Sequence, residues 1–297
     1  MMTHHVLNLG AGVQSTAVAL MFDEGLIGSE PMTVPGEIAG EPIIPECAIF
    51  ADTGEEPDAV YTHLEWLVKQ LSYPVAIVSV GKLGDDLVRG RNSTGGRFAA
   101  VPFYTMGADA EKAEGMTRRQ CTREYKIDPI EQHIRRKILG LEPRKRWPQD
   151  QSVIHHIGIS VDESRRATRI AARFASSSRP EIARFPLLEW GMSRRSCEAF
   201  LKDRVPHTVP RSACVFCPYR SNEEWRRLRD TDPNGWNRAV EVDAALRTTG
   251  SVANRDMTQT MYAHRSCVPL AEADIEPEDD NQWQFSFQGE CEGMCGM

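Results

Sequence analysis

The sequence lacks the features of a membrane or secreted protein. It has no run of about 18 apolar residues, and its start, MMTHHVLNLG, has no basic region followed by an apolar stretch and a cleavage site. Cysteine is also sparse, because eight in 297 residues are too few for a disulfide scaffold. We therefore expect a cytoplasmic protein with reduced thiols. The 41% hydrophobic content suffices for the core of one large α/β domain.

Lysine is scarce, and none precedes Lys69. This absence excludes the P-loop of kinases and GTPases near the N-terminus, because that motif ends in Gly-Lys-Ser or Gly-Lys-Thr. Of the 35 basic residues, 28 are arginine, which suits phosphate, although a genome of high GC content gives the same excess. The net charge is −7, and from Ala271 onward there are eight acids and no Lys or Arg. The body is therefore nearly neutral, which gives little support to nucleic-acid binding.

Apolar strands alternate with amphipathic helices along the first two-thirds of the chain. This order predicts a Rossmann-like α/β fold, a parallel sheet flanked by helices, with a helical C-terminal part. The expected strands are His5–Leu9, Cys47–Ala51, Val75–Val80 and Val153–Ile159. The expected helices are Gln14–Glu24, Asp58–Leu71, Pro129–Leu139, Glu163–Phe174, Arg194–Arg204, Asn222–Arg229 and Gly235–Arg247. We expect residues 1–250 to form one nucleotide-binding domain and residues 251–297 to form an irregular acidic tail.

The stretch VLNLGAGVQSTAVALM, residues 6–21, predicts a strand that ends in Gly10-Ala11-Gly12 and runs directly into a helix. Free backbone N–H groups and the helix dipole make such a turn an anion site. A dinucleotide fingerprint would need Gly or Ala at Ser15. A pyrophosphate loop of the form Ser-Gly-Gly-x-x-Ser matches at Gly12 and Ser15, with Gly10 in place of its first serine. A tight turn without a ligand remains an alternative.

Later segments combine reactive groups with basic neighbours. Asp52-Thr53-Gly54 follows the second expected strand, where the carboxylate could take a metal or a ribose hydroxyl or simply cap a helix. CTREYKIDPI at 121–130, HIGISVDESRR at 156–166 and RSACVFCPYRSNEEW at 211–225 follow in order. Across residues 6–245, this collinear series resembles the phosphoadenosine phosphosulfate reductase family. That family belongs to the N-type ATP pyrophosphatases, or PP-loop proteins, which include thiolating enzymes for tRNA and DNA.

The resemblance implies an adenine-nucleotide site of the PP-loop type. It places Gly10, Ala11, Gly12, Gln14, Ser15 and Thr16 around the nucleotide phosphates, with Asp52 and Thr53 nearby. It also places Gly158, Glu163 and Arg166 at the border of the nucleotide or its sulfur-bearing end. Lys126 and Arg123 would supply positive charge for catalysis beside the segment of Cys121.

The resemblance also implies a metal centre at Cys121, Cys214 and Cys217. Two thiolates in a Cys-x-x-Cys turn can reach a common metal, and Cys121 lies 93 positions before Cys214. Iron–sulfur members of the family have a tandem Cys-Cys at the first position, whereas this chain has Thr122. The fourth ligand of a 4Fe-4S cluster is therefore open between Cys197, Cys291, Cys295 and none. Zinc and buried thiols without a metal are the alternatives.

The C-terminal sequence FQGECEGMCGM offers a further thiol. Assimilatory reductases of the family carry a Glu-Cys-Gly near the C-terminus whose cysteine attacks sulfur, and Glu290-Cys291 is similar. Cys291 is thus a candidate catalytic nucleophile on a mobile tail. Alternatively, the tail cysteines ligate the cluster or have no role.

These observations predict an enzyme that binds ATP with Mg²⁺, adenylates an acceptor and transfers sulfur at an iron–sulfur cluster. The first alternative is a reductase of a sulfated adenylate that uses Cys291. The second is a nucleic-acid-binding or regulatory module with structural zinc. The expected partners are the adenine nucleotide, a nucleic-acid or small-molecule acceptor, and a sulfur donor or thiol reductant, with no membrane. The acceptor and the oligomeric state, a homodimer included, stay open.

Overall fold

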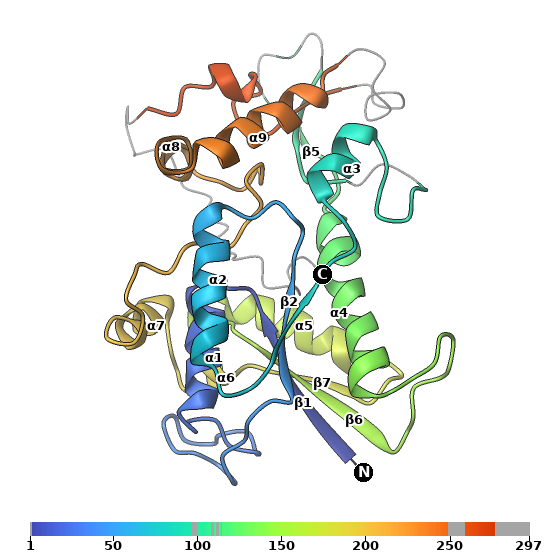
Figure 1. Ribbon diagram of the computed structural model, residues 1–297, viewed down its shortest axis with the longest axis vertical. Helices are drawn as coiled ribbons and strands as arrows, with labels where there is room; N and C mark the ends of the chain where they lie inside the picture. The colour runs from blue at the N-terminus through green and yellow to red at the C-terminus, as the bar shows by residue number, and fades with distance from the viewer. Residues whose placement is uncertain are drawn as a thin grey trace.

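A five-stranded parallel sheet forms the centre of the computed structural model, which describes residues 2–96, 100–107, 110, 113, 115–248 and 259–276 (Figure 1). The strand order is β3-β2-β1-β6-β7. The strands are β1 (Met2–Leu9), β2 (Cys47–Ala51), β3 (Val75–Val78), β6 (Gln151–Ile157) and β7 (Glu181–Arg184). The fold class predicted from the sequence is confirmed.

Helices cover both faces of the sheet, because the side chains of its central strands alternate between the two faces. Leu7 and Phe50 pack on the first face, whereas Val6 and Ile49 pack on the second. The first face carries α1 (Val13–Asp23), α2 (Asp58–Gln70), α6 (Pro186–Glu189) and α7 (Arg194–Leu201). The second face carries α4 (Asp128–His133), its flanking π-helical turns η1 (Arg123–Ile127) and η2 (Ile134–Ile138), and α5 (Ser164–Ala175), which the 3-10 turn η3 (Val161–Glu163) precedes in the chain.

A second core lies beyond the carboxyl ends of the strands, at the top of Figure 1. Phe103, Phe216 and Trp225 are fully buried in it. Its elements are α3 (Leu83–Arg89), α8 (Asn222–Thr231), α9 (Pro233–Ala245), the 3-10 turn η5 (Leu270–Glu272) and a small sheet of order β5-β4-β8. The strands of that sheet are β4 (Tyr104–Met106), β5 (Gly115–Met116) and β8 (Thr260–Tyr262). Part of the expected tail, residues 259–276, therefore joins this second core.

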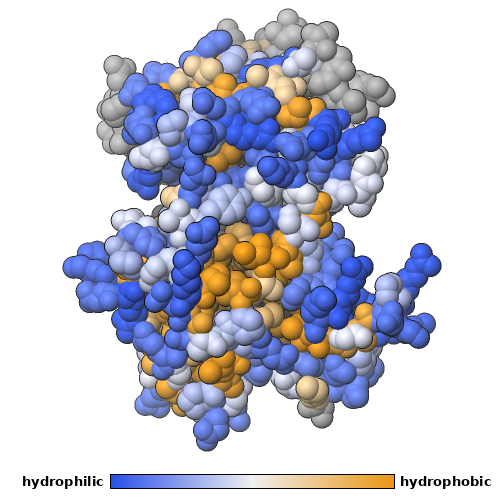
Figure 2. Space-filling model, viewed as in Figure 1, coloured by the Kyte–Doolittle hydropathy of each residue, from blue (hydrophilic) through white to orange (hydrophobic). Residues whose placement is uncertain are grey.

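The space-filling view shows a waist between the two parts of the molecule (Figure 2). Apolar side chains gather just below the waist, over the strands that lie between α2 and α4 in Figure 1. There β3 forms one edge of the sheet, and 58% of its Ile77 side chain is exposed. Within the described part of the chain, no helix is both long and apolar enough to cross a membrane.

Candidate nucleotide site and thiol pocket

The turn between β1 and α1 presents a helix N-terminus at the carboxyl edge of the sheet. Gly12 is the N-cap of α1, and its N–H donates to Ser15 Oγ at 3.2 Å. Thr16 N–H donates to Gly12 O at 2.9 Å and closes the first helical turn. The residues expected to surround phosphate therefore form a strand–turn–helix whose N–H groups can bind an anion.

Ala11 has a left-handed backbone, with φ of 57°. The PP-loop motif has glycine at this position, and glycine adopts positive φ without steric cost. An alanine in this conformation carries a strain of about 1–3 kcal/mol that the surrounding structure must hold. Ala11 is fully buried, so the packing around it maintains the turn.

The turn lies at the point where the strand order reverses. After β3 the chain crosses back to β6, which pairs with the free side of β1. Ligands of open α/β sheets bind in the crevice at such a switch point. Gly158 follows β6 there, and a Cβ atom on it would lie 2.9 Å from both Cα and N of Ser15. Only glycine lets the two segments approach this closely.

Gln14 connects the start of α1 to the segment after β6. Its Nε2 donates to Ser160 Oγ at 2.8 Å and to Glu163 Oε2 at 2.9 Å. Because a carboxylate can only accept, these bonds fix which end of the amide is nitrogen. Arg166 Nη1 donates to the other oxygen of Glu163 at 2.8 Å. Gln14 Oε1 is buried with no hydrogen-bond partner among the described residues, so it can accept from a ligand hydroxyl or amine.

Thr16 faces inward rather than toward the crevice. Its Oγ1 lies 2.9 Å from His63 Nε2, and His63 Nδ1 lies 2.9 Å from His207 Nε2. Burial and, to a lesser extent, the neighbouring His207 lower the pKa of His63 to about 4, so His63 is neutral at pH 7. The side chains of Thr16 and His63 thus support the loop from the protein interior. Sequence reasoning missed His63, which no local motif marks.

Asp52 follows β2 at the same edge of the sheet, since Leu9 pairs with Phe50 in the parallel register. Its Oδ1 accepts from Gly54 N at 2.7 Å and from Tyr61 Oη at 2.9 Å. Burial and the Asp52 carboxylate raise the pKa of Tyr61, which keeps the phenol a donor. Asp52 therefore closes a turn at Gly54 and does not cap α2, whose N-cap is Pro57 with no side-chain hydrogen bond. Both bonds use Oδ1, so Oδ2 is the oxygen that a metal ion or ribose would meet.

The three cysteines Cys121, Cys214 and Cys217 line one pocket at the junction of the sheet and the second core. Cys121 lies just before η1, and Cys214 and Cys217 lie at the two ends of the Cys-x-x-Cys turn. Within this turn the Cys217 N–H donates to Cys214 O at 2.9 Å. Thr53 Oγ1 lies 3.2 Å from Cys214 Sγ. The segment after β2 thus touches the nucleotide crevice through Asp52 and the thiol pocket through Thr53.

A buried ion pair borders the thiol pocket. Lys126, which lines the pocket, places its Nζ 3.2 Å from Glu56 Oε1. Ser212 Oγ donates to Glu56 Oε2 at 3.2 Å. Lys126 and Glu56 are each only 4% exposed, so each charge depends on the other. Glu56 is another residue that the sequence pattern did not mark.

Further cations surround the thiols. Arg119 lines the pocket. Arg220 donates from Nη2 to the carbonyls of Ala213 at 2.7 Å and Cys214 at 3.2 Å. Burial lowers the pKa of Arg220, and the nearby Cys217 partly offsets this by raising it. Positive groups near a thiol favour its thiolate, which is the form that binds metals.

The described residues contain no group of three or more His, Cys, Asp and Glu side chains arranged to hold a metal ion. The cavity among the three thiols is about 30 Å³, which is room for one or two waters. Cys197, a candidate fourth ligand, is fully buried in α7 within the core of the first sheet face. Cys291 and Cys295 lie outside the described residues.

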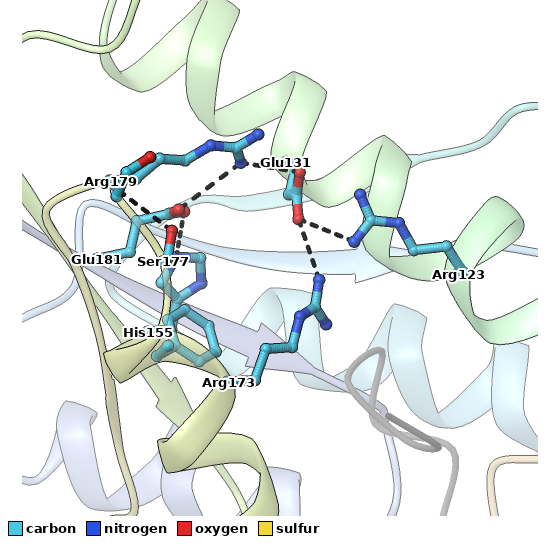
Figure 3. Close-up of a pocket in the computed structure, with 9 residues that line it drawn as sticks. Arg123, Glu131, His155, Arg173, Ser177, Arg179 and Glu181 are labelled. Atoms are coloured by element: carbon cyan, nitrogen blue, oxygen red, sulfur yellow. Dashed lines mark hydrogen bonds and ion pairs between the residues drawn. The ribbon is translucent and has the colours of Figure 1, made fainter.

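Arg123 does not line the thiol pocket. Its Nε pairs with Asp128 Oδ1 at 2.5 Å and its Nη1 with Glu131 Oε1 at 3.4 Å. Figure 3 shows Arg123 in a different pocket, on the opposite side of Glu131 from Arg179.

Comparison of the chain with protein-family models, curated proteins and solved structures finds no match.

Proposed function

We propose that this chain is a PP-loop enzyme that binds ATP in the crevice between β1 and β6 and carries out sulfur transfer or redox chemistry at the thiol pocket. The close approach of Gly158 to Ser15 carries the proposal. It brings two segments together at the switch point of the sheet, with a helix N-terminus open to an anion.

Each part of the crevice suits one part of a nucleotide. Backbone N–H groups of the first turn of α1 stabilise the charge of the phosphates and of a departing pyrophosphate. Asp52 Oδ2 would hold Mg²⁺, which neutralises phosphate charge when bound. Gln14 Oε1 accepts a hydrogen bond from a hydroxyl or the exocyclic amine of the nucleotide. Adenylation of an acceptor oxygen makes AMP the leaving group.

The thiol pocket supplies the type of donor that a metal centre needs, because three thiols line one cavity. Cys121, Cys214 and Cys217 would hold an iron–sulfur cluster, which supplies redox or sulfur-carrying capacity when bound. Lys126 and Arg119 line the same pocket and place positive charge beside the thiols. Thr53 links this pocket to the nucleotide crevice, so an adenylated acceptor would lie near both.

Calorimetry with Mg²⁺ and ATP tests the nucleotide site. We expect saturable binding by the wild type, at least tenfold weaker binding by Gln14→Leu, and unchanged binding by Gln132→Leu, an exposed glutamine on α4. Binding of a sulfated adenylate but not of ATP would favour the reductase alternative. If neither nucleotide binds, the proposed function is wrong.

Anaerobic purification with analysis of iron, sulfide and zinc tests the thiol pocket. We expect iron and sulfide in the wild type and their loss in Cys121→Ala and Cys217→Ala. Cys47→Ala is the matched control, because Cys47 is buried in β2 away from the pocket. Stoichiometric zinc in a colourless protein would contradict the redox mechanism and favour the zinc alternative.

A further inference from the structure

A second pocket of about 310 Å³ lies between α4 and α5, apart from the nucleotide crevice. Its wall includes His155 of β6 and Glu181 of β7, and the loop before β7 supplies Ser177 and Ser178. This volume is at the lower end of those of small-molecule sites. The cavity is larger than the volume that an inorganic anion alone would occupy.

Three guanidinium groups converge on one carboxylate in this pocket. Figure 3 shows Glu131 between Arg123, Arg173 and Arg179. Arg179 Nη1 donates to Glu131 Oε2 at 3.0 Å, which is hydrogen-bond length. Arg123 and Arg173 approach Glu131 Oε1 only to 3.4 and 3.6 Å. One carboxylate therefore provides a short contact to only one of the three arginines.

The other acid that lines the pocket is Glu181, whose Oε1 lies 3.2 Å from His155 Nε2. Arg123 already pairs at 2.5 Å with Asp128, which does not line the pocket. Arg173 is the least satisfied member, because its Nη1 is buried without a hydrogen-bond partner among the described residues. Burial lowers the pKa of Arg173, and the nearby charge of Arg123 lowers it further. An anion beside Arg173 would relieve both effects.

The surroundings of the pocket suit an organic anion. Phe174 lines the pocket, and the centroid of its ring lies 4.9 Å from the centroid of the His155 ring. These two rings provide a partly apolar wall next to the arginines. The basic residues of η2, which continues α4, are Arg135, Arg136 and Lys137. Their field attracts anions toward this side of the molecule.

We propose that this pocket binds a phosphomonoester whose phosphate contacts Arg173 and whose organic part lies against Phe174. A guanidinium with an unpaired Nη1 can bind two phosphate oxygens at once. Ser177 and Ser178 can donate to the same group from the loop before β7. Glu131 contacts the three arginines, and a phosphate would compete with it for them.

Phenyl phosphate is a suitable probe, because it joins a phosphate to a ring without any nucleotide. Calorimetry should show saturable binding, with inorganic phosphate and phenol each binding at least tenfold more weakly. Arg173→Gln should weaken binding of phenyl phosphate by about 10- to 100-fold, the effect of one lost charged hydrogen-bond pair. Arg169→Gln is the matched control on α5, since Arg169 is exposed and does not line the pocket.

Two more variants distinguish a loss of binding at this pocket from a folding defect and from an effect at the nucleotide site. Glu131→Gln removes the competing carboxylate, so phenyl phosphate should bind more tightly. Gln14→Leu, which alters the nucleotide crevice, should bind it as the wild type does. The proposal is overturned if the wild type shows no saturable binding up to millimolar probe, or if Arg173→Gln and Arg169→Gln bind equally. Equal binding of phosphate and phenyl phosphate would overturn the role of Phe174.

Discussion

Gly158 stands so close to Ser15 that a Cβ atom on Gly158 would lie 2.9 Å from the backbone of Ser15. The two residues follow adjacent parallel strands, β1 and β6, at the switch point of the sheet. Their contact is between backbones, so a larger side chain cannot be accommodated by a change of rotamer. The close approach of the two segments therefore depends on a missing side chain.

Gly158→Ala should destabilise the fold by about 1–3 kcal/mol, because the backbone of Ser15 must move. It should also weaken binding of Mg²⁺ and ATP if the crevice is the nucleotide site. Urea unfolding and calorimetry measure the two effects. Gly96→Ala is the control, because a Cβ there meets nothing closer than 3.5 Å. Equal stability of the two variants would show that the contact is not tight in solution.

Ala11→Val should be poorly tolerated, because a β-branched residue at φ of 57° is strained. We expect a loss of more than about 2 kcal/mol, from backbone strain added to overpacking. Ala17→Val gives the overpacking effect alone, since Ala17 is equally buried but helical. Urea unfolding of both variants measures the difference. A smaller loss for Ala11→Val than for Ala17→Val would argue against the left-handed turn.

Lys126→Met should cost about 3–5 kcal/mol, because it removes the ammonium group that pairs with the buried Glu56 carboxylate. The double variant Lys126→Met/Glu56→Gln should recover much of this loss. Arg194→Met breaks an exposed pair with Glu198 of the same 3.2 Å length, and it should cost less than about 1 kcal/mol. Chemical denaturation at pH 7 compares them. Similar losses for Lys126→Met and Arg194→Met would mean that water reaches Glu56.

Acid should destabilise the protein partly through His63. Its pKa is about 4 in the folded state, lowered from 6.5 mainly by burial, so the unfolded chain binds more protons between these values. Stability therefore decreases as pH falls from about 6.5 to 4, by up to about 3 kcal/mol from this group. His63→Gln should reduce the slope of unfolding free energy against pH in this window. An unchanged slope would assign the acid sensitivity to other groups.

Local patterns predicted most of the central sheet and its helices. Cys47–Ala51 has the predicted bounds, and the helix expected over Asp58–Leu71 ends one residue earlier. The strand is marked by a continuous apolar run and the helix by apolar residues at helical spacing. The short elements β7 and α3 were not predicted, because four or seven residues carry too little periodicity. The expected helix over Pro129–Leu139 is part of a longer run that begins at Arg123 and includes two π-helical turns.

The sequence by itself determined the strand–turn–helix at Gly12 and the Cys-x-x-Cys turn, because both depend on residues that are neighbours in the chain. Only the tertiary structure decided which distant residues contact these two turns. Packing brings Cys121 to the pocket of Cys214 and Cys217, and it turns Arg123 away toward Glu131. Such pairings join segments far apart in sequence, and they depend on how helices seat on the sheet rather than on any local propensity.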